Sequence, residues 1–211
     1  MKRIFLGAFI LLVAVGANAQ SNEVKNQLSF GVKGGASFSN IIKTDDSDFK
    51  TDYLTGFNAG IFVSIPIIDR LSFQPELMFS QKGYKSDRTG ILSNGTLTQT
   101  TSWIEVPILA KIEVVKGFNL YAGPQVSFLS KTTNKYEGTF GTAEQTTIED
   151  DADQFKKSIL GGVLGAGFDI TQKVSLNGRY ALDFQKNNEN GTTSTPEFKN
   201  QVWQVGLGLK F

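Results

Sequence analysis

The sequence has 211 residues, with 21 Lys and Arg against 20 Asp and Glu, no His and no Cys. Its length is that of a single domain. The balanced charge gives no reason to expect a nucleic-acid partner, and the absence of Cys excludes disulfide and thiol chemistry.

The first twenty residues have the features of a secretory signal. Lys2 and Arg3 precede an apolar stretch over 4–15, and Ala17-Asn18-Ala19 then forms a small-x-small cleavage pattern. We expect residues 1–19 to be a signal peptide that is removed before Gln20, leaving one domain over 20–211. The apolar stretch is too short for a membrane-spanning helix, and no second long one follows it.

The rest of the chain alternates apolar and polar residues with a period of two, which is typical of β-strands. No segment shows a helical period, so the sequence predicts an all-β fold. The eight predicted strands cover 28–39, 56–67, 71–84, 103–114, 118–128, 160–170, 174–184 and 201–211.

Short and long connections alternate between these strands. The short ones are turns around Asp69-Arg70, Lys116-Gly117 and Gln172-Lys173, and the long polar ones cover 40–55, 85–101, 131–157 and 186–200. Outer-membrane barrels have short periplasmic turns and longer extracellular loops. We therefore expect an eight-stranded antiparallel up-and-down transmembrane β-barrel with three short periplasmic turns, four long extracellular loops and both termini at the short-turn end.

The aromatic residues of the strands favour a barrel whose apolar face points outward to lipid. Most lie near the strand ends, where aromatic girdles occur, and so many rings would overfill an eight-stranded lumen. A secreted lipocalin-like binder, with the apolar face turned inward, is the alternative fold. The aromatic residues are Phe30, Phe38, Phe57, Phe73, Phe79, Phe118, Phe128, Phe168, Tyr180, Phe184, Trp203 and Phe211.

The opposite face carries the charged residues of the strands among Gly, Ser, Asn and Gln. A Lys or Arg facing the centre of a bilayer would cost about 2 to 4 kcal/mol, so we expect these charges to point into the lumen and to pair there. They are Lys33, Glu76, Lys82, Glu105, Lys111, Asp169, Arg179, Asp183 and Lys210.

Distances along the strands from the short turns predict which of these charges meet. Glu76, Lys111 and Arg179 should lie at similar depth. We expect Glu76 to pair laterally with Lys111 while Arg179 reaches across the lumen, with Glu105 and Asp183 in a second layer above.

Several stretches together resemble the small outer-membrane β-barrel domains of PorT-like proteins, which are related in architecture to OmpA and OmpX barrels. They are LSFQPELMFSQKGYK, WIEVPILAKI, FNLYAGPQVSFL, ILGGVLGAGFDI, VSLNGRYALDF and the final VGLGLKF. The resemblance covers nearly all of 20–211 and implies an eight-stranded barrel. It also implies that Phe211 resembles the terminal signal read by the outer-membrane assembly machinery.

The sequence gives no support for an enzyme. Outer-membrane barrel enzymes resemble one another in relying on a His, and this chain has none, so Ser-His or Asp-His activation and an imidazole metal site are excluded. Glu76 and Glu105 could be a paired-carboxylate acid and base, but ion pairing is the better interpretation. We predict no cofactor and no metal.

The loops hold weaker signals. The acidic runs 45–48 and 149–153 could bind Ca²⁺, but they lack the EF-hand spacing, and solvated loop charge is the preferred interpretation. Tyr136 and Phe140 could form a binding tip in the longest loop.

The leading expectation for function is an integral outer-membrane barrel with a structural or loop-mediated binding role, such as adhesion, partner or ligand binding, or assistance to secretion. Its expected partners are outer-membrane lipid, the assembly machinery and an extracellular ligand or envelope protein. The alternatives are a narrow pore for ions or small solutes and the secreted lipocalin-like binder.

Overall fold

The computed structural model describes residues 28–43, 51–89, 94–138, 141–148, 157–187 and 197–211. Within these ranges, no helix is long and apolar enough to span a membrane. The strands are β1 (Ser29–Lys43), β2 (Asp52–Ile68), β3 (Leu71–Thr89), β4 (Asn94–Val115), β5 (Phe118–Gly138), β6 (Gly141–Ile148), β7 (Ser158–Asp169), β8 (Val174–Asp183) and β9 (Phe198–Lys210).

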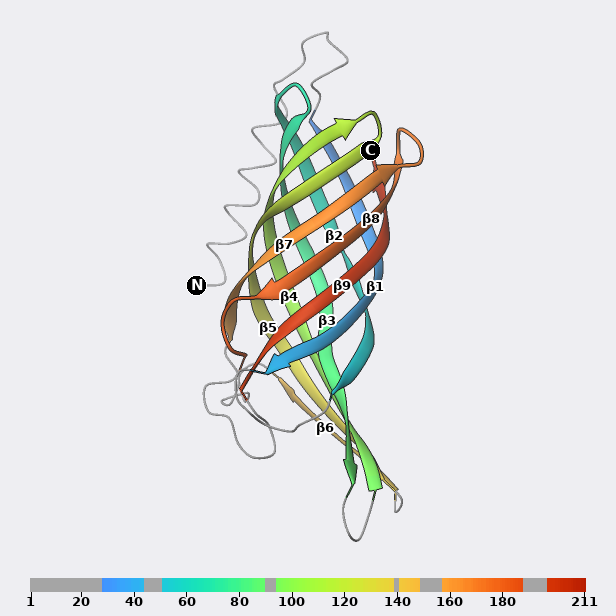
Figure 1. The fold of residues 1–211 in the computed structure, drawn as a ribbon, viewed down its shortest axis with the longest axis vertical. Coiled ribbons are helices and arrows are strands. Elements are labelled where there is room, and N and C mark those ends of the chain that lie inside the picture. The colour runs from blue at the N-terminus through green and yellow to red at the C-terminus, as the bar shows by residue number, and fades with distance from the viewer. Residues whose placement is uncertain (1–27, 44–50, 90–93, 139–140, 149–156, 188–196) are drawn as a thin grey trace.

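Eight of these strands form a closed antiparallel ring. The sheet runs β4-β3-β2-β1-β9-β8-β7-β5-β6, and the additional pairing of β4 with β5 closes it, leaving only β6 outside the ring. Sequential neighbours pair throughout the ring, except that β1 pairs with β9 and β5 with β7 (Figure 1). The predicted eight-stranded up-and-down barrel is confirmed.

The three short turns lie at one end of the barrel, as predicted. Arg70 has a φ of 68° and Gly117 a φ of 84°, which lets the β2–β3 and β4–β5 connections reverse direction within two residues. The Phe211 amide donates a 2.8 Å hydrogen bond to the Phe30 carbonyl oxygen at this same end. The start of β1 and the end of β9 therefore lie beside the short turns (Figure 1).

The apolar face points outward, so the predicted orientation is also confirmed. Leu164 is 64% exposed, and Phe30, Phe57, Trp203 and Phe211 are each more than half exposed on the outer wall. The lumen instead buries charged and amide side chains together with small apolar clusters. A soluble ligand-binding barrel needs the reverse arrangement, and this exterior matches hydrocarbon rather than water.

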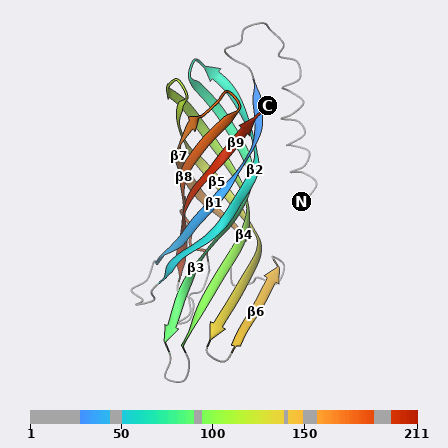
Figure 2. The ribbon, with the colours of Figure 1, turned by 90° about the vertical axis from the view of Figure 1, so that its right-hand side faces the viewer.

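Two of the predicted long loops prove to be largely strand. The segment 85–101 is a hairpin of β3 and β4, and 131–157 contains the end of β5 and all of β6. Both hairpins extend beyond the rest of the barrel at the end opposite the short turns (Figures 1 and 2). The prediction missed them because strands outside a bilayer need no apolar face, and so they lack the alternation that marked the others.

An arginine substitution on the outer wall tests whether that wall faces lipid. Leu164 lies near the middle of β7, and Leu164→Arg should lower the free energy of unfolding by about 2 to 4 kcal/mol in lipid vesicles because the charge would face the bilayer centre. Ile68→Arg, next to a short turn, should cost only about 0 to 1 kcal/mol. Urea titration of vesicle-inserted protein measures both, and equal effects at the two depths would contradict the assignment.

Candidate functional site in the barrel lumen

The middle of the lumen is held by one carboxylate between two cations. Glu76 on β3 forms ion pairs with Lys33 of β1 and, at 3.0 Å, with Nη1 of Arg179 on β8. Its other oxygen, Oε1, accepts a 2.8 Å hydrogen bond from the Gln74 amide. The Glu76 side chain is fully buried, and the charge-assisted bonds offset the cost of removing it from water.

Gln204 on β9 extends this layer to a fourth strand. Its Oε1 accepts a hydrogen bond from Arg179 Nε, and its amide nitrogen donates to Ser80 Oγ at 3.0 Å and to Ser37 Oγ at 3.3 Å. The guanidinium is thereby fixed in orientation from both sides. The layer, called here the Glu76 layer, links β1, β3, β8 and β9 across the lumen.

A second layer lies toward the long-loop end and is centred on a cation. Lys82 Nζ lies 2.7 Å from Glu105 Oε1 and 3.2 Å from Asp183 Oδ1, and its side chain is only 1% exposed. Asp183 Oδ2 also accepts bonds of 3.1 Å from the amides of Asn187 and Asn200. This arrangement, called here the Lys82 layer, joins β3, β4 and β8 with β9.

Trp103 and two aliphatic side chains fill the space beside the Lys82 layer. Lys82 Nζ lies 5.5 Å from the ring centroid of Trp103, within the range of a cation–π contact. Trp103 Nε1 donates a 2.8 Å bond to Thr101 Oγ1, and Trp103 is fully buried against Leu129 and Ile159. The lumen is thus packed with side chains at this height.

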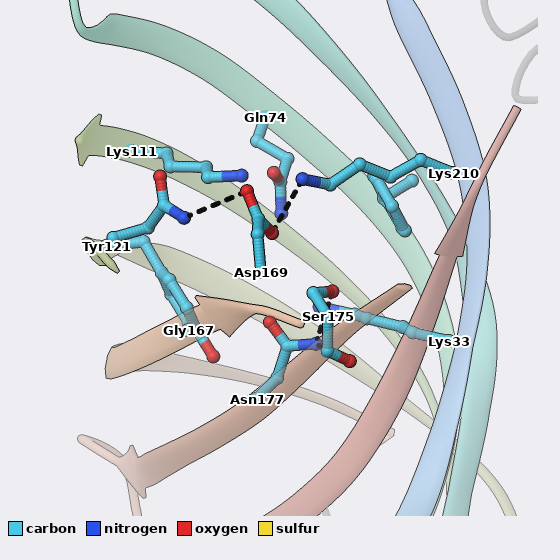
Figure 3. Close-up of a pocket in the computed structure, with 11 residues that line it drawn as sticks. Lys33, Gln74, Lys111, Tyr121, Gly167, Asp169, Ser175, Asn177 and Lys210 are labelled. Atoms are coloured by element: carbon cyan, nitrogen blue, oxygen red, sulfur yellow. Dashed lines mark hydrogen bonds and ion pairs between the residues drawn. The ribbon is translucent and has the colours of Figure 1, made fainter. Parts of the chain in front are cut away.

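The short-turn end of the lumen is less filled. Lys210 Nζ pairs with Asp169 Oδ1 at 2.7 Å, and the Asn119 amide donates to Asp169 Oδ2 at 3.5 Å. Lys111 points into the same space from β4, as Figure 3 shows. The cavity has a volume of about 20 Å³, room for about one ordered water molecule.

Two of the predicted groupings of lumen charges are present in the structure, and one predicted ion pair is not. Glu76 and Arg179 do meet across the lumen, and Glu105 and Asp183 do share a layer. The predicted pairing of Glu76 with Lys111 is wrong. The β3–β4 register places Lys111 opposite Ser72, four residues from Glu76, because tilted strands are staggered and equal counts from the turns do not give equal height.

Sequence reasoning placed Lys33 and Lys82 in the lumen but did not assign their partners. Lys33 is the lone cation on an inward face otherwise made of Gly and Ser, and Lys82 shares its inward face with Glu76, so each could have been marked as the counter-charge of a buried carboxylate. The amide partners Gln74, Gln204 and Asn200 carried no such signal. Amides on an inward face look the same whether or not they contact a charge.

The loop residues are only partly described. Tyr136 lies in β5, paired with Leu97 of β4 and Ala143 of β6, whereas Phe140, 45–48 and 149–153 fall outside the described residues. Phe211 stacks near Phe30, with ring centroids 5.7 Å apart. Among the described residues, no group of three or more His, Cys, Asp or Glu is placed to hold a metal ion.

Comparison with known proteins returns one family. Residues 18–189 match the family model described as outer membrane protein beta-barrel domain. No curated protein sequence matches the chain.

The fold is also similar to several solved barrels, at low identity. The attachment invasion locus protein Ail of Yersinia pestis has a TM-score of 0.48 at 13% identity, covering 87% of this chain and 98% of its own. Neisserial surface protein A has a TM-score of 0.49 at 15% identity, with coverages of 86% and 97%. The outer membrane protease OmpT of Escherichia coli has a TM-score of 0.46 at 8% identity, with coverages of 92% and 99%.

Removal of the shared carboxylate tests the Glu76 layer. Glu76→Ala leaves Lys33 and Arg179 without their counter-charge, so the free energy of unfolding should fall by about 3 to 5 kcal/mol. Glu137→Ala is the matched control, because Glu137 is exposed at the long-loop end and its loss should matter little. An unchanged unfolding curve for Glu76→Ala in detergent or vesicles would contradict the layer.

Proposed function

The chain belongs to the outer membrane protein β-barrel domain family, and we propose that it is a non-enzymatic anchor that carries a β-sheet arm outside the cell for binding a partner. As a member of this family it is an integral outer-membrane protein of a Gram-negative cell. In such barrels the short turns face the periplasm and the long connections face outward. The β3–β4 and β5–β6 hairpins then lie on the extracellular side.

The arm consists of residues 85–89, 94–102, 131–138 and 141–148. Its strands are hydrogen-bonded in one continuous sheet, as the row Lys85, Thr98, Lys135 and Glu144 illustrates. Side-chain bonds add to it, among them Gln99 Nε2 to Asn134 Oδ1 at 2.9 Å. A sheet of this kind holds its shape beyond the bilayer in a way that a free loop does not.

The arm is polar and electrostatically mixed. Lys135 Nζ lies 2.7 Å from Glu137 Oε1 on the exposed sheet, and this hydrogen bond raises the pKa of Lys135 and lowers that of Glu137. Thr133 and Thr146 hydroxyls lie 3.2 Å apart across β5 and β6. Such a surface suits polar recognition in water rather than insertion into lipid.

The single observation that carries the proposal is the free edge of β6. Among the described strands, β6 ends the sheet order and pairs with β5 alone, and it exposes residues 141–146. An unpaired strand edge presents a row of backbone N–H and C=O groups to which an extended peptide can add as a further strand. The partner class that fits is therefore an extended, polar segment of an extracellular or envelope protein.

The non-enzymatic part of the proposal rests on the chemistry of the lumen. The sequence has no His, and the buried carboxylates Glu76, Glu105 and Asp183 are each engaged with a cation. A carboxylate held in this way has a structural use and is poorly suited to exchange protons with a substrate. The Lys82 layer likewise argues against a pore, because buried side chains fill the lumen there.

Export and assembly complete the proposal. We propose that residues 1–19 direct secretion and are removed, and that Phe211 is recognised by the assembly machinery. Phe211 is exposed on the outer wall beside Phe30, where a receptor could reach it before insertion.

Conductance tests whether the lumen is closed. Purified protein in a planar bilayer should give no steady single-channel openings, because the Lys82 layer blocks the path. A triple variant has Ala in place of Lys82, Glu105 and Asp183. It removes all three charges of the layer, so that none of them is left without its partner, and channel openings should appear. Ala substitutions at the outward-facing Leu160, Leu164 and Leu176 serve as the control. Steady openings in the unmodified protein would favour the pore alternative.

Shortening the arm tests the binding role. In one variant, 87–96 and 133–146 are each replaced by an Asn-Gly turn, which should close hairpins at Ser86–Leu97 and Thr132–Thr147 and leave the ring intact. A phage-displayed library of linear peptides is panned against the full protein in nanodiscs. Enriched peptides should bind the full protein and lose binding to the shortened one.

The control for this experiment is the folded state of the shortened barrel, followed by its resistance to unfolding on unheated electrophoresis. Peptides that bind both proteins equally, or a library that yields no enrichment on the full protein, would contradict a binding role for the arm.

A further inference from the structure

The two halves of the lumen carry opposite charge. The Lys82 layer combines one cation with the two carboxylates of Glu105 and Asp183, a surplus of negative charge. The periplasmic half has four cations and three carboxylates, a surplus of one positive charge. The residues of the periplasmic half are Lys33, Lys111, Arg179, Lys210, Glu76, Asp169 and Glu113.

This positive surplus surrounds two adjoining cavities, called here the inner vestibule. Lys33, Tyr121 and Asn177 line both of them, the first cavity also has Lys111, Asp169 and Lys210 in its lining, and the second has Arg179. Each cavity has a volume of about 20 Å³. Figure 3 shows Lys111 and Lys210 extending toward Asp169 from opposite walls of the first cavity.

Two donors in the inner vestibule are not used by the protein's own acceptors. Within the described part of the chain, Lys111 forms no ion pair within 4.0 Å, and Nη2 of Arg179 is buried without a hydrogen-bond acceptor. Glu113 is the further carboxylate on this end of β4, but it accepts a hydrogen bond from the Gly117 amide at the turn and lines neither cavity. The positive surplus therefore remains.

Exposure decreases from the periplasmic mouth toward the Lys82 layer. The side chains of Asp169 and Lys210 are 25% and 18% exposed, that of Lys33 is 10% exposed, and that of Lys82 is 1% exposed. An anion can reach the inner vestibule from the periplasm, and the negative surplus of the Lys82 layer repels it from going further.

We propose that the inner vestibule is a binding site for a single phosphate group that enters from the periplasm. Lys111 supplies the main charge contact. Lys33 and Lys210 share their ammonium donors between the phosphate group and their carboxylate partners. Arg179 orients the deepest phosphate oxygen. Guanidinium and ammonium groups are the usual protein partners of phosphate oxygens. Because each cavity is small, the phosphate group is held by one face, with its remaining oxygens toward the periplasm.

Calorimetric titration with inorganic phosphate tests the site on the full barrel in a neutral detergent. Wild-type protein should bind one phosphate per barrel, and Lys111→Gln should weaken the affinity about tenfold or more through loss of a charged hydrogen-bond donor. Lys116→Gln is the matched control, since it removes the same charge from the exposed turn at the same end of β4 and should leave the affinity unchanged. Equal weakening by both substitutions would overturn the site in favour of general charge attraction.

A second variant separates binding from folding. Asp169→Asn removes the carboxylate that competes for Lys210, so phosphate affinity should increase, a change that mere damage to the barrel would not produce. Chloride at matched ionic strength should compete weakly. No heat of binding for wild type or for Asp169→Asn, with both barrels folded on unheated electrophoresis, would overturn the proposal.

Nanodiscs distinguish the two sources of the phosphate group. If the physiological ligand is a lipid headgroup, phosphatidic acid in a phosphatidylcholine disc should lower the apparent affinity for inorganic phosphate in wild type but not in Lys111→Gln. If it is a free phosphate ester, the lipid should have no effect and glycerol phosphate should compete. Either result supports a phosphate site, and failure of both ligands to compete would contradict it. The outcome is independent of the arm, which lies on the other side of the membrane.

Discussion

The structure depends on one constraint: within the membrane span, a closed ring with a hydrocarbon-facing exterior leaves only the lumen for charged side chains. A soluble protein can solvate its charged side chains at the surface, but here the strands turn that surface toward lipid. Glu76, Lys82 and Asp183 must therefore find partners on other strands. The resulting ion pairs connect walls that the backbone ladder does not join, and they act as struts across the barrel.

Backbone pairing between strands and ion pairs across the lumen stabilise the fold in different ways. Antiparallel pairing satisfies the backbone of each strand around the ring, which is the condition for any sheet in a membrane. The ion pairs across the lumen hold opposite strands at a fixed distance from one another. Small residues make room for them: Gly165 lies opposite Tyr121, whose ring covers it and whose hydroxyl donates a 3.2 Å bond to the Gly178 carbonyl oxygen. An alanine at Gly165 would collide with that ring.

Most of the ring could be predicted from the sequence because one physical signal repeats in every strand. Phe30, Leu164 and Trp203 had to face lipid and Glu76 and Lys82 had to face inward, so a period of two fixed both the strands and their orientation. The partner of Glu76 could not be predicted in the same way. Pairing depends on strand stagger, which arises from the tilt of the whole ring and left Lys111 opposite Ser72. The arm was missed for a different reason, since strands in water on both faces carry no apolar alternation.

The pairing of β1 with β9 has a consequence for how the barrel forms. This seam joins residues such as Gly31 and Lys210, which are almost the full described chain apart, and the Phe211 amide adds its bond to Phe30 beside it. Contacts between such distant residues form late, because the intervening chain must first be ordered. A chain that lacks β9 leaves the edge of β1 that faces β9 unpaired, so the ring can close only once β9 is in place.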